Sequence, residues 1–302
     1  MKSTRFSATE VRDSMDIQRS FKAKKPTLFL VATPIGNLSD MSERAVETLQ
    51  SVAAVFAEDT RVSGPLLSHF NVNTSLYSLH AHNESRKRSH VLNYLHNGED
   101  IAYITDAGTP LLSDPGSSIV RAVIDAGYYV VAIPGANAAV TALTVSGLMP
   151  HPFMFYGFLP TKAGAREKTL HHLASLTCTL VFYETPNRMK TTLAHMYQIF
   201  GERDVSIARE ITKQYETVYR FKLSEYNTLE SMKGEAVLIV SGADEPPYDT
   251  EDALTHVTLL MEDGLSEKEA IKIAAKARNV PKNTIYMMVQ NHKNMTKDSS
   301  EE

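Results

Sequence analysis

Carboxylates, a histidine and an arginine stand where predicted strands end. Glu58, Asp59 and Arg61 directly follow the apolar run 53–57, and His82 precedes a helix rich in basic residues. A carboxylate or an imidazole can accept a proton during catalysis, and an arginine can hold a phosphate or a carboxylate. The same side chains could instead cap helices or form surface ion pairs, so their types alone leave their roles open.

Three loops rich in glycine and proline also follow predicted strands, at 33–38, 106–116 and 134–138. In open α/β sheets, ligands bind in the crevice outside the carboxyl ends of the strands. Small residues there allow the backbone to approach a ligand closely. The three loops together therefore predict a small-molecule site.

Several familiar sites are missing from the sequence. There is no G-x-G-x-x-G after the first strand, no G-x-x-x-x-G-K-[ST] and no G-x-S-x-G. A standard dinucleotide site, a P-loop and a nucleophile elbow are therefore unsupported. His80 and His82 could share a strand face, but no cysteine or carboxylate pair completes a set of ligands, so we expect no metal. Cys178 precedes a buried strand and is expected to pack in a core.

Apolar runs alternate with helical patterns through the first half of the chain, which is typical of an α/β domain with a mostly parallel sheet. The pattern restarts after the Gly/Pro-rich stretch 147–152. Further strands are predicted at 153–158, 179–183, 205–209, 218–222 and 235–240. Acidic residues at the ends of these strands (Tyr183-Glu184, Arg209-Glu210), with Lys233-Gly234-Glu235 before the last, indicate a lined cleft between two domains.

Composition describes an ordinary globular chain: 302 residues, 43% of them hydrophobic, with a formal net charge of −4. No apolar stretch approaches the roughly 20 residues of a membrane-spanning helix, and no secretory signal is recognisable. A single cysteine excludes an intrachain disulfide and fits a reducing cytoplasm. The charge is uneven, because residues 1–25 alone carry +4.

A second basic segment lies at 265–293, where Ser266 and Glu269 form a capping-box signature before an Ala/Ile face at helical spacing. It is interpreted as two short helices, which could touch nucleic acid or simply pack together. The predicted organisation is a disordered basic tail 1–25, an N-terminal α/β domain 26–147, a C-terminal α/β domain 148–243, a basic helical unit 250–293 and a disordered tail 294–302.

Taken in order, several of these stretches resemble one family. They are ATPIGNLSD (32–40), AEDTR (57–61), HNESR (82–86), DAGTPLLSDPG (106–116), PGANA (134–138), GFLPTK (157–162), FYETPNR (182–188), ARE with ITK (208–213) and GEAVLIVSG (234–242). The chain resembles the tetrapyrrole-methylase-like (class III) S-adenosylmethionine methyltransferases. Within them it is most similar to the bacterial enzymes that 2′-O-methylate a cytidine ribose in small-subunit (16S) ribosomal RNA.

The resemblance implies two α/β domains with S-adenosylmethionine in the cleft between them, in a homodimer that acts on the decoding region of the assembled small subunit. The cofactor contacts it implies are Pro34, Ile35, Gly36, Asp106, Ala107, Gly108, Thr109, Pro110, Ser113, Asp114, Gly135, Ala136, Ala138, Phe182, Tyr183, Arg209, Glu210, Ala236 and Val237. Candidates for withdrawing the hydroxyl proton are Asp106, Asp114, Glu58, Asp59 and His82. Candidates for contacting RNA are Arg61, Asn83, Glu84, Arg86, Arg88 and Lys162.

Two other functions remain open at this stage. A methyltransferase of the same fold could act on a tetrapyrrole or on a protein residue. A non-catalytic RNA-binding assembly factor could also retain the fold.

Overall fold

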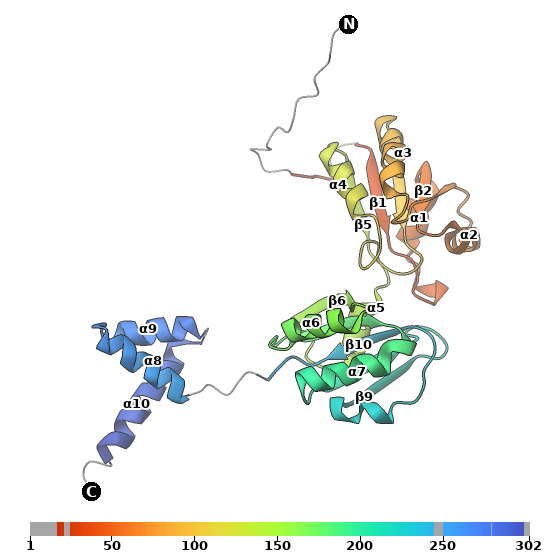
Figure 1. The fold of residues 1–302 in the computed structure, drawn as a ribbon. Helices are drawn as coiled ribbons and strands as arrows, with labels where there is room; N and C mark the ends of the chain where they lie inside the picture. Colours follow the sequence, from red (N-terminus) through yellow and green to blue (C-terminus); the bar gives the residue numbers. More distant parts are fainter. Residues whose placement is uncertain (1–16, 21–24, 245–249, 279, 299–302) are drawn as a thin grey trace. The chain divides into compact units, whose positions relative to one another are not determined.

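The computed structural model describes residues 17–20, 25–244, 250–278 and 280–298. The chain divides into two compact units, 1–242 and 243–302 (Figure 1). Most of the predicted tail 1–25, and residues 299–302 of the predicted tail 294–302, lie outside the described residues. Within the first of these tails, the Gln18 side chain both donates to and accepts from the Val130 backbone, with distances of 2.8 and 3.1 Å.

A five-stranded parallel sheet forms the first half of the large unit, in the order β3-β2-β4-β1-β5. Its strands are β1 (Thr27–Val31), β2 (Ala54–Ala57), β3 (Ser75–Ser78), β4 (Ile101–Ile104) and β5 (Tyr129–Ile133). The helices α1 (Glu43–Ser51) and α2 (Thr60–His69) bury apolar residues on one face. The helices α3 (Glu84–His96) and α4 (Ser117–Asp125) do so on the other. The parallel α/β prediction is confirmed here.

A second five-stranded sheet, in the order β6-β7-β10-β8-β9, is mixed. Its strands are β6 (Phe153–Phe158), β7 (Thr179–Glu184), β8 (Asp204–Arg209), β9 (Thr217–Lys222) and β10 (Ala236–Val240). β6 and β7 are parallel, whereas β10 runs antiparallel to both β7 and β8, and β9 antiparallel to β8. The helices α6 (Ala163–Leu173) and α7 (Pro186–Phe200) cover one face. Two short 3₁₀ helices, η1 (Leu38–Asp40) and η2 (Leu223–Thr228), complete the unit.

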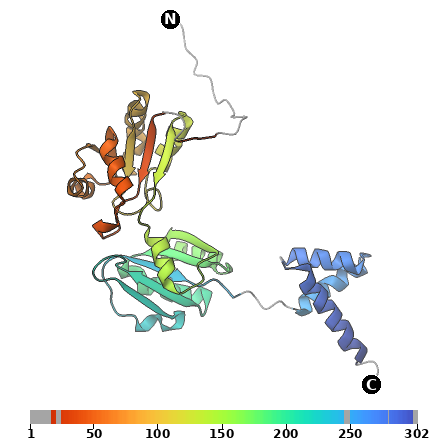
Figure 2. The same ribbon diagram turned by 180° about the vertical axis from the view of Figure 1, so that it is seen from behind.

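The helix α5 (Ala138–Ser146) covers the other face of the second sheet (Figure 2). Its residues Ala139, Ala142 and Leu143 pack with Val181 and Val237. The sequence analysis predicted no helix here, because AAVTALTVS is apolar nearly throughout and lacks the two-faced period that marks a surface helix. The segment precedes residue 147 in the chain but belongs to the core of the second sheet.

The small unit contains α8 (Thr250–Glu262), α9 (Glu267–Ala277) and α10 (Lys282–Asp298), joined by a core of their own. The predicted capping box is present: the Ser266 hydroxyl accepts from the Glu269 backbone N–H, and the Glu269 carboxylate accepts from Ser266. The sequence analysis expected two helices within 265–293, and the structure adds α8 before them and continues α10 beyond residue 293. Among the described residues, no helix is long and apolar enough to cross a membrane.

Candidate active site

The three glycine- and proline-rich loops of the first half are tied to one another. Thr33 and Gly108 exchange two backbone hydrogen bonds of 2.9 and 3.1 Å, which link the loop after β1 to the loop after β4. The Thr109 hydroxyl donates to the Ala136 carbonyl at 3.2 Å, which links the second loop to the third. Gly108 has a φ of +79°, a backbone conformation that glycine adopts without strain. One edge of the parallel sheet therefore carries a connected set of loops.

These loops form one wall of a cavity of about 320 Å³, a size typical of small-molecule sites. The opposite wall comes from the second sheet, at the ends of β7 and β8 and the start of β10. Because β10 runs antiparallel to its two neighbours, its first residue Ala236 pairs with Glu184 and with Arg209, the last residues of β7 and β8. Ala236 thus reaches the same edge as residues that lie 27 and 52 positions earlier in the chain.

Unusual backbone conformations are concentrated around this cavity. Leu111, Ser113, Glu210 and Thr212 have φ between +52° and +74° although none is glycine. Such conformations cost roughly 1–3 kcal/mol each and persist where the surrounding structure enforces them. Ser113 and Glu210 line the cavity directly. A concentration of strained backbone is typical of functional sites, so it makes the cavity the candidate site.

Eleven of the predicted cofactor residues lie on the cavity wall: Ile35, Ala107, Gly108, Thr109, Ser113, Asp114, Ala138, Tyr183, Glu210, Ala236 and Val237. Eight others do not line it: Pro34, Gly36, Asp106, Pro110, Gly135, Ala136, Phe182 and Arg209. Phe182 differs for a clear reason, because alternate residues of a strand face opposite sides of the sheet. Tyr183 faces the cavity, whereas Phe182 is fully buried in the core beneath α6 and α7.

The cavity also has wall residues to which the sequence analysis gave no cofactor role: Leu112, Phe158, Glu184, Thr185, Pro186, Ala208, Ile211, Lys213, Gly234 and Glu235. All ten belong to the stretches that carry the family resemblance, so the signal was present in the sequence. Glu184, Gly234 and Glu235 had been expected to line a cleft.

Three carboxyl groups near the ends of β2 and β4 influence one another. Burial and the Glu58 charge raise the pKa of Asp114 to about 6. Burial and the Asp106 charge also raise the pKa of Glu58, and burial raises that of Asp106. Of the three, Asp114 is the one that lines the cavity. It combines access to a ligand with a pKa close to neutrality.

Asp59 and Arg61 are engaged with each other. The Asp59 side chain accepts from the Arg61 backbone at 2.8 Å, as the N-cap of α2, and also from the Arg61 guanidinium. Hydrogen bonds from Arg61 lower the pKa of Asp59 to about 2. Asp59 is therefore a weak base, and its backbone N–H donates to the Asp106 carboxylate at 3.1 Å.

Two predicted RNA contacts have structural partners instead. The Asn83 side chain is buried, accepts from the His80 backbone at 2.9 Å and donates to the Ser78 carbonyl at 3.3 Å. The Glu84 carboxylate accepts from the Ser118 hydroxyl at 2.6 Å and from the Ser118 and Ile119 backbone N–H groups. It thereby caps α4, whose own N-cap residue is a glycine.

The remaining candidates are surface side chains. Arg86 and Arg88 on α3 and Lys162 before α6 are exposed, as is His82. The Arg61 side chain is 88% exposed despite its pairing with Asp59. The three arginines and Lys162 are cations available to a polyanion in solution.

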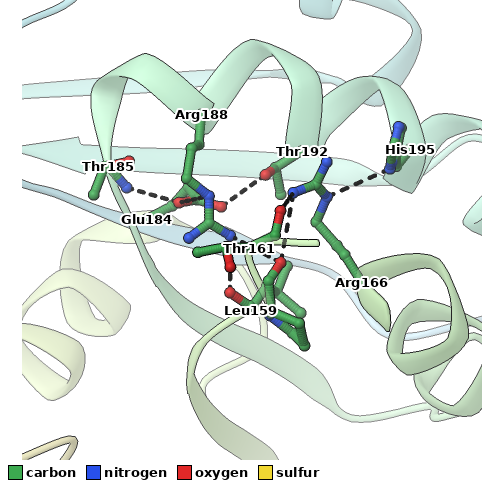
Figure 3. Close-up of polar contacts among 9 residues, drawn as sticks. Leu159, Thr161, Arg166, Glu184, Thr185, Arg188, Thr192 and His195 are labelled. Carbon is green, nitrogen blue, oxygen red and sulfur yellow. Dashed lines mark hydrogen bonds and ion pairs between the residues drawn. The ribbon is translucent and has the colours of Figure 1, made fainter. Parts of the chain in front are cut away.

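A network of polar groups extends from Glu184 on the cavity wall (Figure 3). The Glu184 carboxylate is fully buried, lies 3.3 Å from the Arg188 Nε and accepts from the Thr192 hydroxyl at 2.7 Å. Arg188 also donates to the Leu159 carbonyl at 2.8 Å, and Arg166 donates to the Thr161 carbonyl at 3.3 Å. The network fixes the β6–α6 loop beside Phe158, which lines the cavity.

Lys213 is held between two carboxylates on the cavity wall. Its ammonium lies 3.1 Å from Glu210 and 2.7 Å from Glu235. Although burial opposes it, hydrogen bonds to these two groups raise the pKa of Lys213. A Cβ on Gly36 would overlap the Lys213 stem, so the lysine packs directly against the loop after β1.

In the part of the chain that the structure describes, no cluster of three or more potential metal ligands occurs.

Residues 27–227 match the family model for Tetrapyrrole (Corrin/Porphyrin) Methylases. The chain belongs to this family. It is 43% identical to "Ribosomal RNA small subunit methyltransferase I" of Bacillus subtilis (strain 168), over 89% of this chain and 96% of that protein. The protein of the same name from Synechocystis sp. is 41% identical, over 86% of this chain and 96% of its own length.

Solved structures share the fold of this family member at low sequence identity. Uroporphyrin-III C-methyl transferase from Thermus thermophilus, complexed with S-adenyl homocysteine, is 17% identical with a TM-score of 0.52, covering 72% of this chain and 97% of that one. Diphthine synthase is 12% identical with a TM-score of 0.55, covering 72% of this chain and 90% of that one. These likenesses concern the architecture alone.

Proposed function

We propose that this protein transfers the methyl group of S-adenosylmethionine to the 2′-hydroxyl of a cytidine in the decoding region of small-subunit ribosomal RNA, on the assembled subunit. The observation that carries the proposal is the cavity with several carboxylates on its wall, lined by the same stretches that resemble the rRNA-modifying branch of the family. The relatives named as small-subunit rRNA methyltransferases cover 89% and 90% of the chain.

The cavity suits a ligand with this cofactor's charges. Asp114, Glu184, Glu210 and Glu235 line it, with Lys213 as the one cation among its lining residues. A sulfonium and an ammonium are favoured by surrounding carboxylates and carbonyls, and an adenine by the apolar wall of Ala138, Ala236 and Val237. A Cβ on Gly234 would overlap the Glu210 carboxylate, so glycine allows this carboxylate to pack directly against the backbone of the wall.

The bound cofactor supplies an electrophilic methyl group, and the chain supplies the position and the proton acceptor. A ribose hydroxyl is a weak nucleophile until its proton is withdrawn. Asp114 is our candidate acceptor, because it reaches the cavity and its pKa is about 6. Besides burial, the charges of Glu58 and Asp106 raise the pKa of this group, and the backbone N–H of Asp59 donates to the Asp106 carboxylate. His82 is exposed and belongs to the surface that RNA approaches.

The RNA is held by exposed cations on the elements that border the cavity. Arg86 and Arg88 lie in the first two turns of α3, and Lys162 precedes α6. Since the helices after parallel strands begin at the carboxyl edge of the sheet, the two arginines lie at the edge that carries the cavity loops. Phosphate contacts of this kind position the strand without reading its sequence.

The test is to map ribose methylation on small subunits from a strain that lacks the native enzyme and is complemented with this chain. We expect one methylated cytidine in the decoding region. Label found only in a porphyrinoid or a protein after incubation with labelled cofactor would replace the RNA substrate. Calorimetry that detects no heat with S-adenosylmethionine at high protein concentration would favour a non-catalytic assembly factor.

We also propose that the protein is a homodimer. We propose a cytoplasmic location as well, because the proposed substrate is ribosomal. The edge strand β6 supports the dimer, because Phe153, Met154 and Tyr156 are 42%, 38% and 36% exposed on it. Exposed apolar residues on an unpaired edge are a liability unless a partner covers them. Sedimentation analysis should show a dimer that Met154→Lys weakens, and a monomeric wild-type protein would contradict this arrangement.

A further inference from the structure

The small C-terminal unit carries a row of lysines on α9. Lys268, Lys272 and Lys276 are all exposed, and they follow one another at four-residue spacing. Side chains at this spacing share one side of a helix and are about 6 Å apart along its axis. The other side of α9, with Ala270, Ile271, Ala274 and Ala275, is buried in the core of the unit.

The acidic side chains of α9 have other partners. Glu267 pairs with Lys293 and accepts from Gln290 at 3.3 Å. Glu269 accepts from the Ser266 hydroxyl at 2.5 Å and completes the capping box, so its carboxylate is directed towards the helix N-terminus. Within the described residues, no ion pair includes any of the three lysines. The row is therefore a positively charged strip.

A strip of like charges has a cost for the free protein. Two lysines four residues apart destabilise a helix by about 0.2–0.5 kcal/mol, and this row contains two such pairs. The unit has a complete apolar core without them, so packing does not require these lysines. A polyanionic partner would turn the unfavourable arrangement into a favourable one, because each phosphate contact releases counterions.

The following helix adds groups that suit a nucleic acid. On α10, Lys282 is exposed, Tyr286 four residues later is 48% exposed and Met287 is 58% exposed. Exposed aromatic rings in RNA-binding proteins stack on unpaired bases. A purely electrostatic contact with an acidic protein would not need such a ring, so the combination favours a nucleic acid.

We propose that the lysine row of α9 is an RNA-docking surface that binds phosphates of small-subunit ribosomal RNA. The inference rests on the proposed function for the identity of the RNA. The cavity and the exposed arginines of α3 belong to the large unit, so this surface adds affinity through a separately folded unit joined to it by the chain.

The test compares Lys268→Gln/Lys272→Gln/Lys276→Gln with a control that removes three cations of the large unit, Arg44→Gln/Arg121→Gln/Lys168→Gln. Glutamine keeps the helix propensity of lysine, so both proteins should remain folded by circular dichroism. Binding to small ribosomal subunits and to protein-free small-subunit RNA is measured over a range of salt concentrations. Calorimetry with S-adenosylmethionine provides a readout independent of RNA.

We expect the α9 variant to bind both probes about 10- to 30-fold more weakly, with the slope of log affinity against log salt reduced by about 2. Replacing the three lysines by arginine should retain binding, and cofactor affinity should not change in either variant. A folded α9 variant with unchanged affinity and salt slope would overturn the proposal. A loss seen with whole subunits but not with protein-free RNA would also overturn it, and would identify a ribosomal protein as the partner. If the α9 variant binds RNA more weakly and the wild-type protein transfers no methyl group, the proposed function is contradicted while this surface is supported.

Discussion

Asp114 places a carboxyl group in a cavity that is already acidic. Its pKa is raised to about 6 by burial and by the charge of Glu58. The ionisation of this carboxyl group therefore depends on the charge of the ligand that enters the cavity. A cation would favour the ionised form, whereas a water-filled cavity leaves it close to half-protonated near pH 6.

Asp114→Asn should therefore stabilise the free protein above pH 6 by about 1 kcal/mol, a value reduced for its partial exposure. Since the folded-state pKa of Asp114 is above its ordinary value of 3.8, the folded protein holds this proton more tightly. The wild-type protein accordingly loses stability as pH rises from about 4 to 6, and the variant lacks this loss. Denaturant unfolding at pH 4 and pH 7.5 measures the difference, and equal effects at both pH values would contradict it.

The same substitution tests the catalytic role of Asp114. The methyl-transfer rate of the wild-type protein should rise through pH 6 as the carboxylate ionises, and Asp114→Asn should lower the rate about 100-fold and remove this rise. Cofactor affinity is measured alongside by calorimetry. A variant that transfers methyl groups at the wild-type rate but binds cofactor weakly would show that Asp114 is a cofactor ligand and not the base.

Glu184 and Arg188 form an ion pair in which the glutamate side chain is 0% exposed and the arginine side chain is 23% exposed. Arg188→Met should cost about 3 kcal/mol, because it leaves the Glu184 carboxylate buried with only neutral partners. Adding Glu184→Gln to it should recover part of that loss. Urea unfolding of the two single variants and the double variant gives the coupling free energy of the pair. If the two changes in the free energy of unfolding simply add, the pair is not coupled.

At the scale of elements, the helix α4 is capped by a residue of the neighbouring helix α3. Gly116 precedes α4 and has no side chain with which to cap it. Glu84 at the start of α3 supplies the missing acceptor to Ser118 and Ile119. The carboxylate also lies at a helix N-terminus, where negative charge is favoured.

Glu84→Ala should therefore lower the free energy of unfolding by about 1–2 kcal/mol, as expected for the loss of a cap. Arg86→Ala, two residues away on the exposed side of α3, is the matched control and should change stability little. Thermal unfolding measures both. If Glu84→Ala instead weakened only RNA binding and left stability unchanged, the glutamate would be an RNA contact and not a cap.

Among the elements, strands were predicted better than some helices. The buried strands of the first sheet are short apolar runs between turn residues, and β2 lies within the apolar run 53–57 recognised in the sequence. The helix α2 begins at Thr60 and contains Pro65. The Asp59 cap fixes that start, whereas the pattern of apolar residues alone does not show it.

At the scale of the whole molecule, the two units have separate cores, so each should unfold with its own free energy of unfolding. The unit 243–302 buries its apolar residues among its own three helices, and the large unit has its own layers. A chain ending at residue 244 should therefore keep the melting temperature and cofactor affinity of the large unit, and bind small ribosomal subunits more weakly. Calorimetry and subunit binding measure these properties. Loss of cofactor binding on truncation would show that the large unit depends on the C-terminal helices.

The sequence by itself determined the parallel sheet, the loops at its carboxyl edge and the family, because these are local: apolar runs, turn residues and contiguous motifs. Only the tertiary structure decided which residues share a site. The antiparallel course of β10 brings 234–237 beside 183–186 and 210–213, strand alternation turns Tyr183 inward and Phe182 away, and α5 joins a sheet formed by later strands. Such outcomes depend on pairing and packing between distant segments, and no local pattern encodes them.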